Sequence, residues 1–187
     1  MRQPTSVIVT AYSPEWPRAF ERECAALEAI LAPLPITIEH IGSTSVPGLS
    51  AKPIIDIMLG APSLADIEAR MPIIEALGYE HLPEMRELMP DNRFFAKPHS
   101  LPRRFHLHAV EYDGTFWREH LLFRDLLRTD HTLATEYETL KDRLATEFRF
   151  QPKRYTDAKG PFINSVVRGE APRTVPDRGN SAIRSND

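Results

Sequence analysis

Two β-type runs joined by a polar turn, at residues 36–59, constrain the fold more than any other part of the chain. Residues 36–41 and 53–59 are rich in isoleucine, and Gly42 with three hydroxyl residues follows the first run. β-Branched residues favour strands, and glycine lets the backbone turn sharply. The segment therefore predicts two strands connected by a tight, polar turn.

Capping residues and apolar periodicity predict helices on either side of this segment. Ser13 is expected to cap a helix with Pro14 in its first turn. Ser63 is expected to open a second helix that is kinked or restarted at Pro72 and ends at Gly78. Helical periodicity predicts helices at 14–33, 64–77, 116–128, 130–148 and 157–167.

Further β-type runs are predicted at residues 7–9, 79–82, 93–97 and 104–112. The last two are expected to form a hairpin around residues 98–102. Because the strands at 36–41 and 53–59 are joined by a short connection, they need not be parallel. We therefore predict an α+β fold: a mixed, mainly antiparallel sheet flanked by helices, with C-terminal helices.

Length and composition indicate one globular domain over residues 1–168, followed by a disordered tail at 169–187 with almost no apolar residues. A net charge of −3 argues against a dedicated nucleic-acid binder. The chain shows no apolar run that would span a bilayer and no signal-peptide pattern, so a cytoplasmic protein without a membrane partner is expected. Cys24 is the single cysteine, which excludes an intramolecular disulfide and a cysteine-based zinc site.

The turn after Gly42 is a candidate phosphate site, although it is not a P-loop. Five residues separate Gly42 from Gly48, and Lys52 is followed by proline rather than by serine or threonine. Hydroxyls and backbone amides near a glycine can still bind an anion. The alternative is an ordinary sharp connection whose hydroxyls bond within the protein. The candidate phosphate-binding residues are Gly42, Ser43, Thr44, Ser45 and Lys52, with Arg104 on a later strand.

Asp56 and a histidine pair are the candidate chemical groups. On a strand, Asp56 shares a face with Lys52 and Met58, and an aspartate in an apolar run needs a cation, a metal or hydrogen-bond donors. A structural ion pair with Lys52 is the alternative. His106 and His108 also share one strand face, which suits a pair of metal or phosphate ligands, although histidines in strands are often structural.

The sequence HIGSTSVPGLSAKPIIDI at 40–57, with YSPEW at 12–16, resembles the GrpB family of bacterial proteins. Later pieces agree with the resemblance: FHLHAV at 105–110, FRDLLR at 123–128 and YTDAK at 155–159. The resemblance covers about residues 10–168. It implies the polymerase-β-like fold of the nucleotidyltransferase superfamily.

The superfamily pattern implies a role for each part of this segment. A Gly-Ser pair holds nucleotide phosphates, and two alternating carboxylates on the next strand bind Mg²⁺, with a third carboxylate on a later strand. Gly42-Ser43 and Asp56 match this pattern, but Met58 stands where the second carboxylate is expected. Asp56, His106 and His108 would suit a single divalent ion such as Mn²⁺ or Zn²⁺ better than two Mg²⁺, with Glu39 as an additional ligand.

The leading hypothesis is a nucleotidyltransferase-like protein that binds a nucleotide or another phosphorylated small molecule, with metal-dependent nucleotidyl transfer at Asp56 as its reaction. Arg104, Arg124 and Lys159 are weaker phosphate candidates, and solvated surface charge explains Arg124 and Lys159 at least as well because both lie on predicted helices. The alternative is a non-catalytic ligand-binding module that has lost transfer chemistry, which Met58 favours. A phosphoesterase that uses the histidine pair is a third reading.

Overall fold

The computed structural model describes residues 6–98 and 102–170. Of the predicted tail, only Gly169 and Glu170 fall within this part, and the tip of the predicted hairpin also lies outside it. None of the helices in these residues is long and apolar enough to cross a membrane.

A mixed sheet forms the centre of the described chain. Its strands are β1 (Thr37–Ile41), β2 (Ile55–Ala61), β3 (Glu80–His81), β4 (Asn92–Lys97) and β5 (Phe105–Glu111). They lie in the order β1-β2-β5-β4-β3. The β2–β5 pair is parallel and the other neighbours are antiparallel, including the predicted β4–β5 hairpin. The predicted α+β fold with a mainly antiparallel sheet is therefore confirmed.

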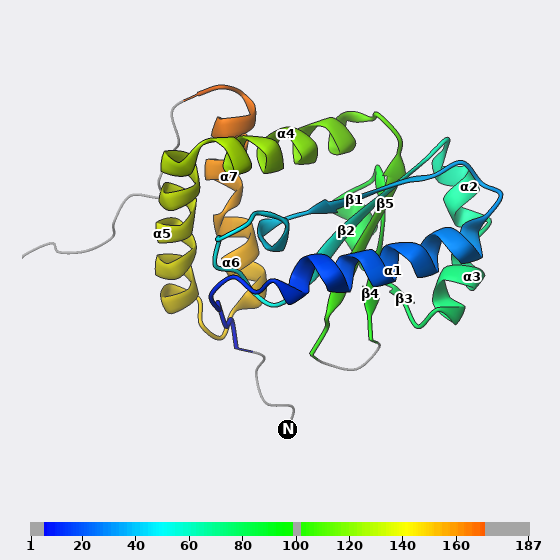
Figure 1. Ribbon diagram of the computed structural model, residues 1–187, viewed down its shortest axis with the longest axis horizontal. Helices are drawn as coiled ribbons and strands as arrows, with labels where there is room; N and C mark the ends of the chain where they lie inside the picture. Colours follow the sequence, from blue (N-terminus) through cyan, green and yellow to red (C-terminus); the bar gives the residue numbers. More distant parts are fainter. Residues whose placement is uncertain (1–5, 99–101, 171–187) are drawn as a thin grey trace, which may run out of the picture.

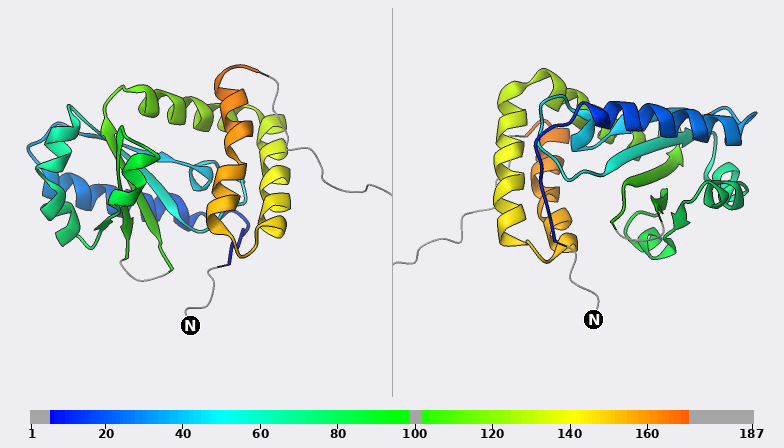
Figure 2. Two further views of the ribbon diagram at one scale, coloured as in Figure 1. Left: turned by 180° about the vertical axis from the view of Figure 1, so that it is seen from behind. Right: turned by 60° about the horizontal axis from the view of Figure 1, so that its bottom comes forward.

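Helices surround this sheet on three sides (Figures 1 and 2). They are α1 (Glu15–Leu31), α2 (Leu64–Glu68), α3 (Met71–Ala76), α4 (Thr115–Thr129), α5 (His131–Glu147), α6 (Pro152–Ala158) and α7 (Gly160–Val167), with 3₁₀ turns η1 (Ser43–Ser45) and η2 (Pro83–Glu87). Helix α1 runs along one face of the sheet. Helices α5, α6 and α7 stand together at the opposite end of the molecule from α2 and α3.

The predicted helix at 64–77 is two short helices, for the reasons the sequence indicates. The Ser63 hydroxyl accepts a hydrogen bond from the Asp66 N–H at 3.2 Å, which caps α2. Pro72 lacks an N–H and therefore fits the first turn of a new helix, α3, rather than the interior of a long one. Gly78 follows α3 with a φ of 95°, a conformation that favours glycine.

Three local predictions are wrong or shifted. Residues 7–9 form no strand, because Val7 packs among the C-terminal helices and its N–H bonds to the Arg149 carbonyl. The predicted helix at 157–167 is broken between α6 and α7, where Gly160 is followed by Pro161. Helix α1 has its cap position at Pro14 rather than Ser13, although the Ser13 hydroxyl accepts the Glu15 N–H at 3.3 Å.

The two faces of the sheet pack differently. Ile55, Ile57 and Leu59 of β2 are buried against α1, α2 and α3 in the largest core cluster. On the other face Met58 belongs to a small cluster with Trp117 of α4. A third cluster joins helices α4 to α7 with Val7, Val46 and Leu49. Asp56, at the start of β2, lies where this second face meets the C-terminal helices.

Candidate functional site

Asp56 lies directly over the backbone of Gly42. Ile41 pairs with Asp56 across β1 and β2, and Gly42 continues the chain into η1. A Cβ on Gly42 would stand 2.4 Å from Oδ2 of Asp56, and the residue has φ 69° and ψ −176°. Only glycine accommodates both the conformation and the close carboxylate. The glycine is therefore required by the position of Asp56.

Thr44 is held inside the turn by a buried histidine. Its hydroxyl donates to the Ile54 carbonyl at 3.3 Å and lies 3.1 Å from Nε2 of His40. The His40 ring stacks on Phe20 with centroids 4.7 Å apart. Burial, only partly offset by the Asp56 carboxylate, lowers the pKa of His40 to about 4. A neutral His40 thus joins β1 to the turn that carries the candidate phosphate residues.

The two serines of the turn also have partners within the protein. The Ser45 hydroxyl donates to the Gly42 carbonyl at 2.6 Å, and the Ser45 carbonyl accepts two bonds from Arg128 at 2.9 and 3.1 Å. The Ser43 side chain lies near the buried Tyr137 hydroxyl. The hydroxyls of Thr44 and Ser45 hold the turn in shape, so any contact they make with a ligand comes in addition to these bonds.

The parallel pairing of β2 with β5 brings Asp56 and His106 together. They are register partners, and Nδ1 of His106 lies 3.1 Å from Oδ1 of Asp56. Their side chains are 28% and 26% exposed, so both are accessible to a ligand. Burial acts to raise the pKa of Asp56, but the His106 hydrogen bond and the charge of Lys159 lower it overall. Asp56 is therefore an ionised carboxylate at neutral pH.

Two lysines complete the surroundings of Asp56. Nζ of Lys52 and Nζ of Lys159 lie 5.7 and 4.7 Å from the centre of the same Tyr155 ring. Burial lowers the pKa of Lys159 to about 8, although the Asp56 carboxylate opposes this shift. Burial lowers the pKa of Lys52 as well, again against Asp56. Neither ammonium forms an ion pair within residues 6–98 and 102–170.

The chain matches the family described as GrpB protein over residues 6–168. It belongs to the GrpB family. The glutamate-rich protein GrpB of Alkalihalophilus pseudofirmus is 36% identical over 165 residues, which cover 86% of this chain and 94% of that protein. A UPF0157 protein of Halalkalibacterium halodurans is 34% identical over 166 residues, covering 87% and 82% of the two chains. The crystal structure of the conserved protein GrpB from Enterococcus faecalis aligns with a TM-score of 0.78 at 36% identity, over 87% of this chain and 96% of that one.

His108 stands apart from the Asp56–His106 pair in this GrpB protein. It is the register partner of Met58, and its Nδ1 lies 2.8 Å from Nδ2 of Asn92. The rings of Phe94 and Phe116 lie 4.9 and 5.5 Å from its own. Burial lowers the pKa of His108 to about 3, so the ring is neutral. Its environment is that of a structural histidine in an aromatic cluster.

The donor set around Asp56 does not fit the metal centre that the superfamily implies. Met58, at the second carboxylate position, is fully buried in an apolar cluster. The Glu39 carboxylate accepts a 2.6 Å hydrogen bond from Arg124, whose guanidinium also binds Asp125 at 2.7 Å. In the part of the chain that the structure describes, no three histidine, cysteine, aspartate or glutamate side chains are grouped to hold a metal ion. A hard divalent cation would find one carboxylate with two ammonium groups beside it.

Two of the weaker phosphate candidates, Arg104 and Lys159, have different surroundings. Arg104 is exposed at the start of β5, with its guanidinium 6.0 Å from the Phe105 ring. Lys159 lies at the bend between α6 and α7, half-buried and facing Asp56. Its spacing of four residues from Tyr155 was the available signal, because residues four apart share one face of a helix. His40 and Tyr137 were missed as neighbours of the turn, since nothing local to either indicates its partner.

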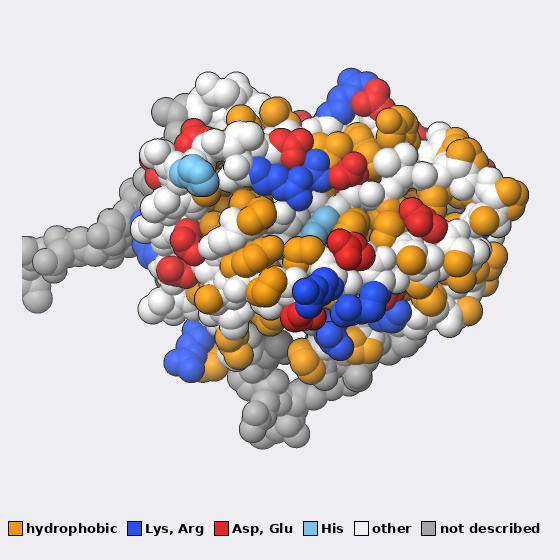
Figure 3. Space-filling view, in the orientation of Figure 1, with side chains coloured by type: hydrophobic (Ala, Val, Ile, Leu, Met, Phe, Trp, Pro, Cys, Tyr) orange, Lys and Arg blue, Asp and Glu red, His pale blue; other side chains and the backbone are white. Residues whose placement is uncertain are grey.

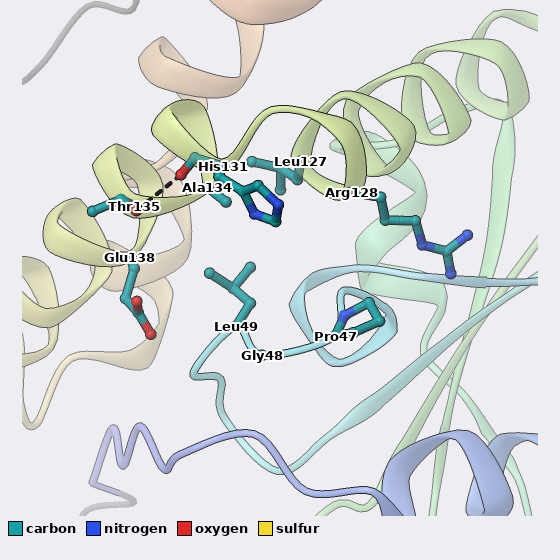
Figure 4. A pocket seen from close by; sticks show the side chains of 9 residues that line it. All are labelled: Pro47, Gly48, Leu49, Leu127, Arg128, His131, Ala134, Thr135 and Glu138. Atoms are coloured by element: carbon teal, nitrogen blue, oxygen red, sulfur yellow. Dashed lines mark hydrogen bonds between the residues drawn. The ribbon is translucent and has the colours of Figure 1, made fainter.

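A cavity of about 480 Å³ lies on the other side of the turn, between residues 47–49 and the α4–α5 junction (Figure 4). Leu49 and Leu127 line it together with Arg128 and Glu138. Glu138 also accepts the Ser50 N–H at 2.9 Å. Asp56, His106 and the two lysines are not part of its wall. Arg128, through its bonds to the Ser45 carbonyl, connects this cavity to the turn beside Asp56.

Proposed function

We propose that this GrpB-family protein binds a nucleotide or another phosphorylated small molecule at the Asp56 site. The observation that carries the proposal is the pair of half-buried lysines, Lys52 and Lys159, whose ammonium groups both lie near the Tyr155 ring. Partly buried charges without an ion-pair partner are costly, and a phosphate group supplies the partner they lack. Asp56 and His106 lie next to them and offer an acceptor and a ring nitrogen for the rest of the ligand.

The distribution of charge supports a small ligand rather than a polyanion. On the face shown in Figure 3, lysine and arginine side chains lie in separate groups, each with aspartate or glutamate beside it, and do not form one continuous basic surface. Nucleic-acid binders depend on such a surface. The lysines at the site therefore favour one or a few phosphate groups.

Calorimetric titration of each of the four ribonucleoside triphosphates tests the proposal. Lys159→Ala should weaken binding about tenfold or more, because a charge-assisted contact contributes about 1.5–3 kcal/mol. Lys153→Ala is the matched control, since Lys153 lies on the same helix, is exposed, and pairs with Asp157 at 2.8 Å. Equal effects of the two variants would refute the proposal, and no binding of any triphosphate would exclude these nucleotides as the ligand.

Nucleotidyl transfer is the second candidate function, because Asp56 occupies the position of the superfamily's first carboxylate. This reaction is tested by measuring pyrophosphate release from each triphosphate with Mg²⁺ or Mn²⁺, in the wild-type protein and in the Asp56→Asn variant. Turnover that Asp56→Asn abolishes would establish an enzyme. Binding without turnover would establish the non-catalytic module, which buried Met58 favours.

A further inference from the structure

The ammonium groups of two lysines lie at the Asp56 site, where the superfamily implies a metal ion. Oδ1 of Asp56 lies 3.1 Å from Nδ1 of His106, and the next residue on the same face of β2 is Met58. Glu39 is bound to Arg124. Mg²⁺ at nucleotide sites is held by one or two carboxylates together with substrate phosphates and waters, and within the described residues no second carboxylate is grouped with Asp56 and His106 to hold a metal ion.

The two lysines are fixed in position by different parts of the fold. Lys52 belongs to the connection that enters β2, and Lys159 is the residue at which α6 ends and α7 begins. Both reach the same Tyr155 ring, whose face attracts cations. Tyr155 is itself 2% exposed and packs in the core of the C-terminal helices. The fold therefore holds two ammonium groups beside one carboxylate.

We infer that the site binds phosphate without a divalent metal, with the ammonium groups of Lys52 and Lys159 supplying the charge that a metal supplies elsewhere in the superfamily. This inference deepens the proposed function and depends on it. A divalent ion next to Asp56 would be repelled by both ammonium groups. The ligand class is a free phosphate ester: a monophosphate, or a nucleotide that is not complexed with Mg²⁺.

The test compares binding of AMP and ATP in EDTA with binding in excess Mg²⁺, measured by calorimetry on the full chain. The inference predicts that the wild-type protein binds in EDTA at least as tightly as in Mg²⁺. Lys159→Met should weaken binding in EDTA about tenfold or more, and Lys159→Arg should retain most of it because the charge is kept. Lys153→Met should bind like the wild type, and urea unfolding verifies that each variant is folded.

The two proposals fail in different ways. Binding that appears in Mg²⁺ and disappears in EDTA would overturn the metal-free inference and leave the proposed function standing. Binding in EDTA that Lys159→Met leaves unchanged would also overturn it, because the charge would then come from elsewhere. No binding of AMP or ATP under either condition would refute the proposed function itself, and the inference with it.

Discussion

Replacing Gly42 with alanine should damage both the stability of the protein and the geometry of Asp56. At φ 69° and ψ −176° the residue occupies a backbone region that is almost exclusive to glycine, which costs a side chain about 1–3 kcal/mol. The new Cβ would also stand 2.4 Å from Oδ2 of Asp56, well inside van der Waals contact. Moving the carboxylate away breaks its bond to His106, a further loss of about 1–3 kcal/mol for a charged group. We expect Gly42→Ala to lower the free energy of unfolding by about 2–6 kcal/mol.

Urea unfolding followed by tryptophan fluorescence measures this loss, and a second glycine provides the control. Gly48 also has a positive φ, 82°, but a Cβ there would meet no atom within 4 Å. Gly48→Ala should therefore cost only the conformational term of about 1–2 kcal/mol. In an Asp56→Ala background, where the carboxylate is gone, Gly42→Ala should cost at least about 1 kcal/mol less than in the wild type. The reasoning is wrong if the two glycine variants lose the same stability, or if removing the Asp56 carboxylate makes no difference.

Three further predictions concern buried charges and the turn. Burial lowers the pKa of Lys141 from 10.5 to about 8, so between these pH values the unfolded chain binds more protons and stability should rise with pH. Lys141→Met should reduce this rise, measured as the urea midpoint at each pH, and an unchanged pH dependence would contradict the lowered pKa. The pKa of His40 falls from 6.5 to about 4, so stability should decrease as the pH drops through this range, and His40→Gln should lessen the decrease. Arg128→Ala removes both bonds to the Ser45 carbonyl and should lower the free energy of unfolding by about 1–3 kcal/mol. The control Arg118→Ala, which removes an exposed ion pair, should lower it by about 0–1 kcal/mol. Similar losses in the two variants would show that the turn does not depend on Arg128.

Features decided by neighbouring residues were predictable from the sequence. The cap at Ser63, the restart at Pro72 and the stop at Gly78 each depend on the backbone chemistry of one residue, and all three are confirmed. The β4–β5 hairpin joins strands that are adjacent in the chain, so its pairing also followed from local pattern. The family resemblance added the overall architecture, which its match over residues 6–168 supports.

Features decided by packing between distant segments were not predictable in this way. Residues 7–9 have the composition of a strand, but their place in the fold is set by Arg149 and the C-terminal helices. The bend between α6 and α7 places Lys159 near Asp56, and its four-residue spacing from Tyr155 does not by itself distinguish it from a surface lysine. The partners of Thr44 and Ser45 come from His40 and Arg128. Sequence identifies the polar atoms of a site more readily than the bonds that already satisfy them.

Residues 56 and 58 share one face of β2, and their different surroundings explain why the site has a single carboxylate. Asp56 is at the start of the strand, beside the turn and the two lysines, where its oxygens remain accessible. Two residues further, about 6.6 Å along the strand, Trp117 of α4 covers the sheet and Met58 is fully buried beneath it. A carboxylate at position 58 would be buried among the side chains of Ile41, Val110 and Trp117, where burial of its charge is costly. Replacing Met58 with a carboxylate residue therefore cannot by itself restore a two-carboxylate centre, because helix α4 covers that part of the sheet. A ligand at this site is bound by the charged groups around Asp56.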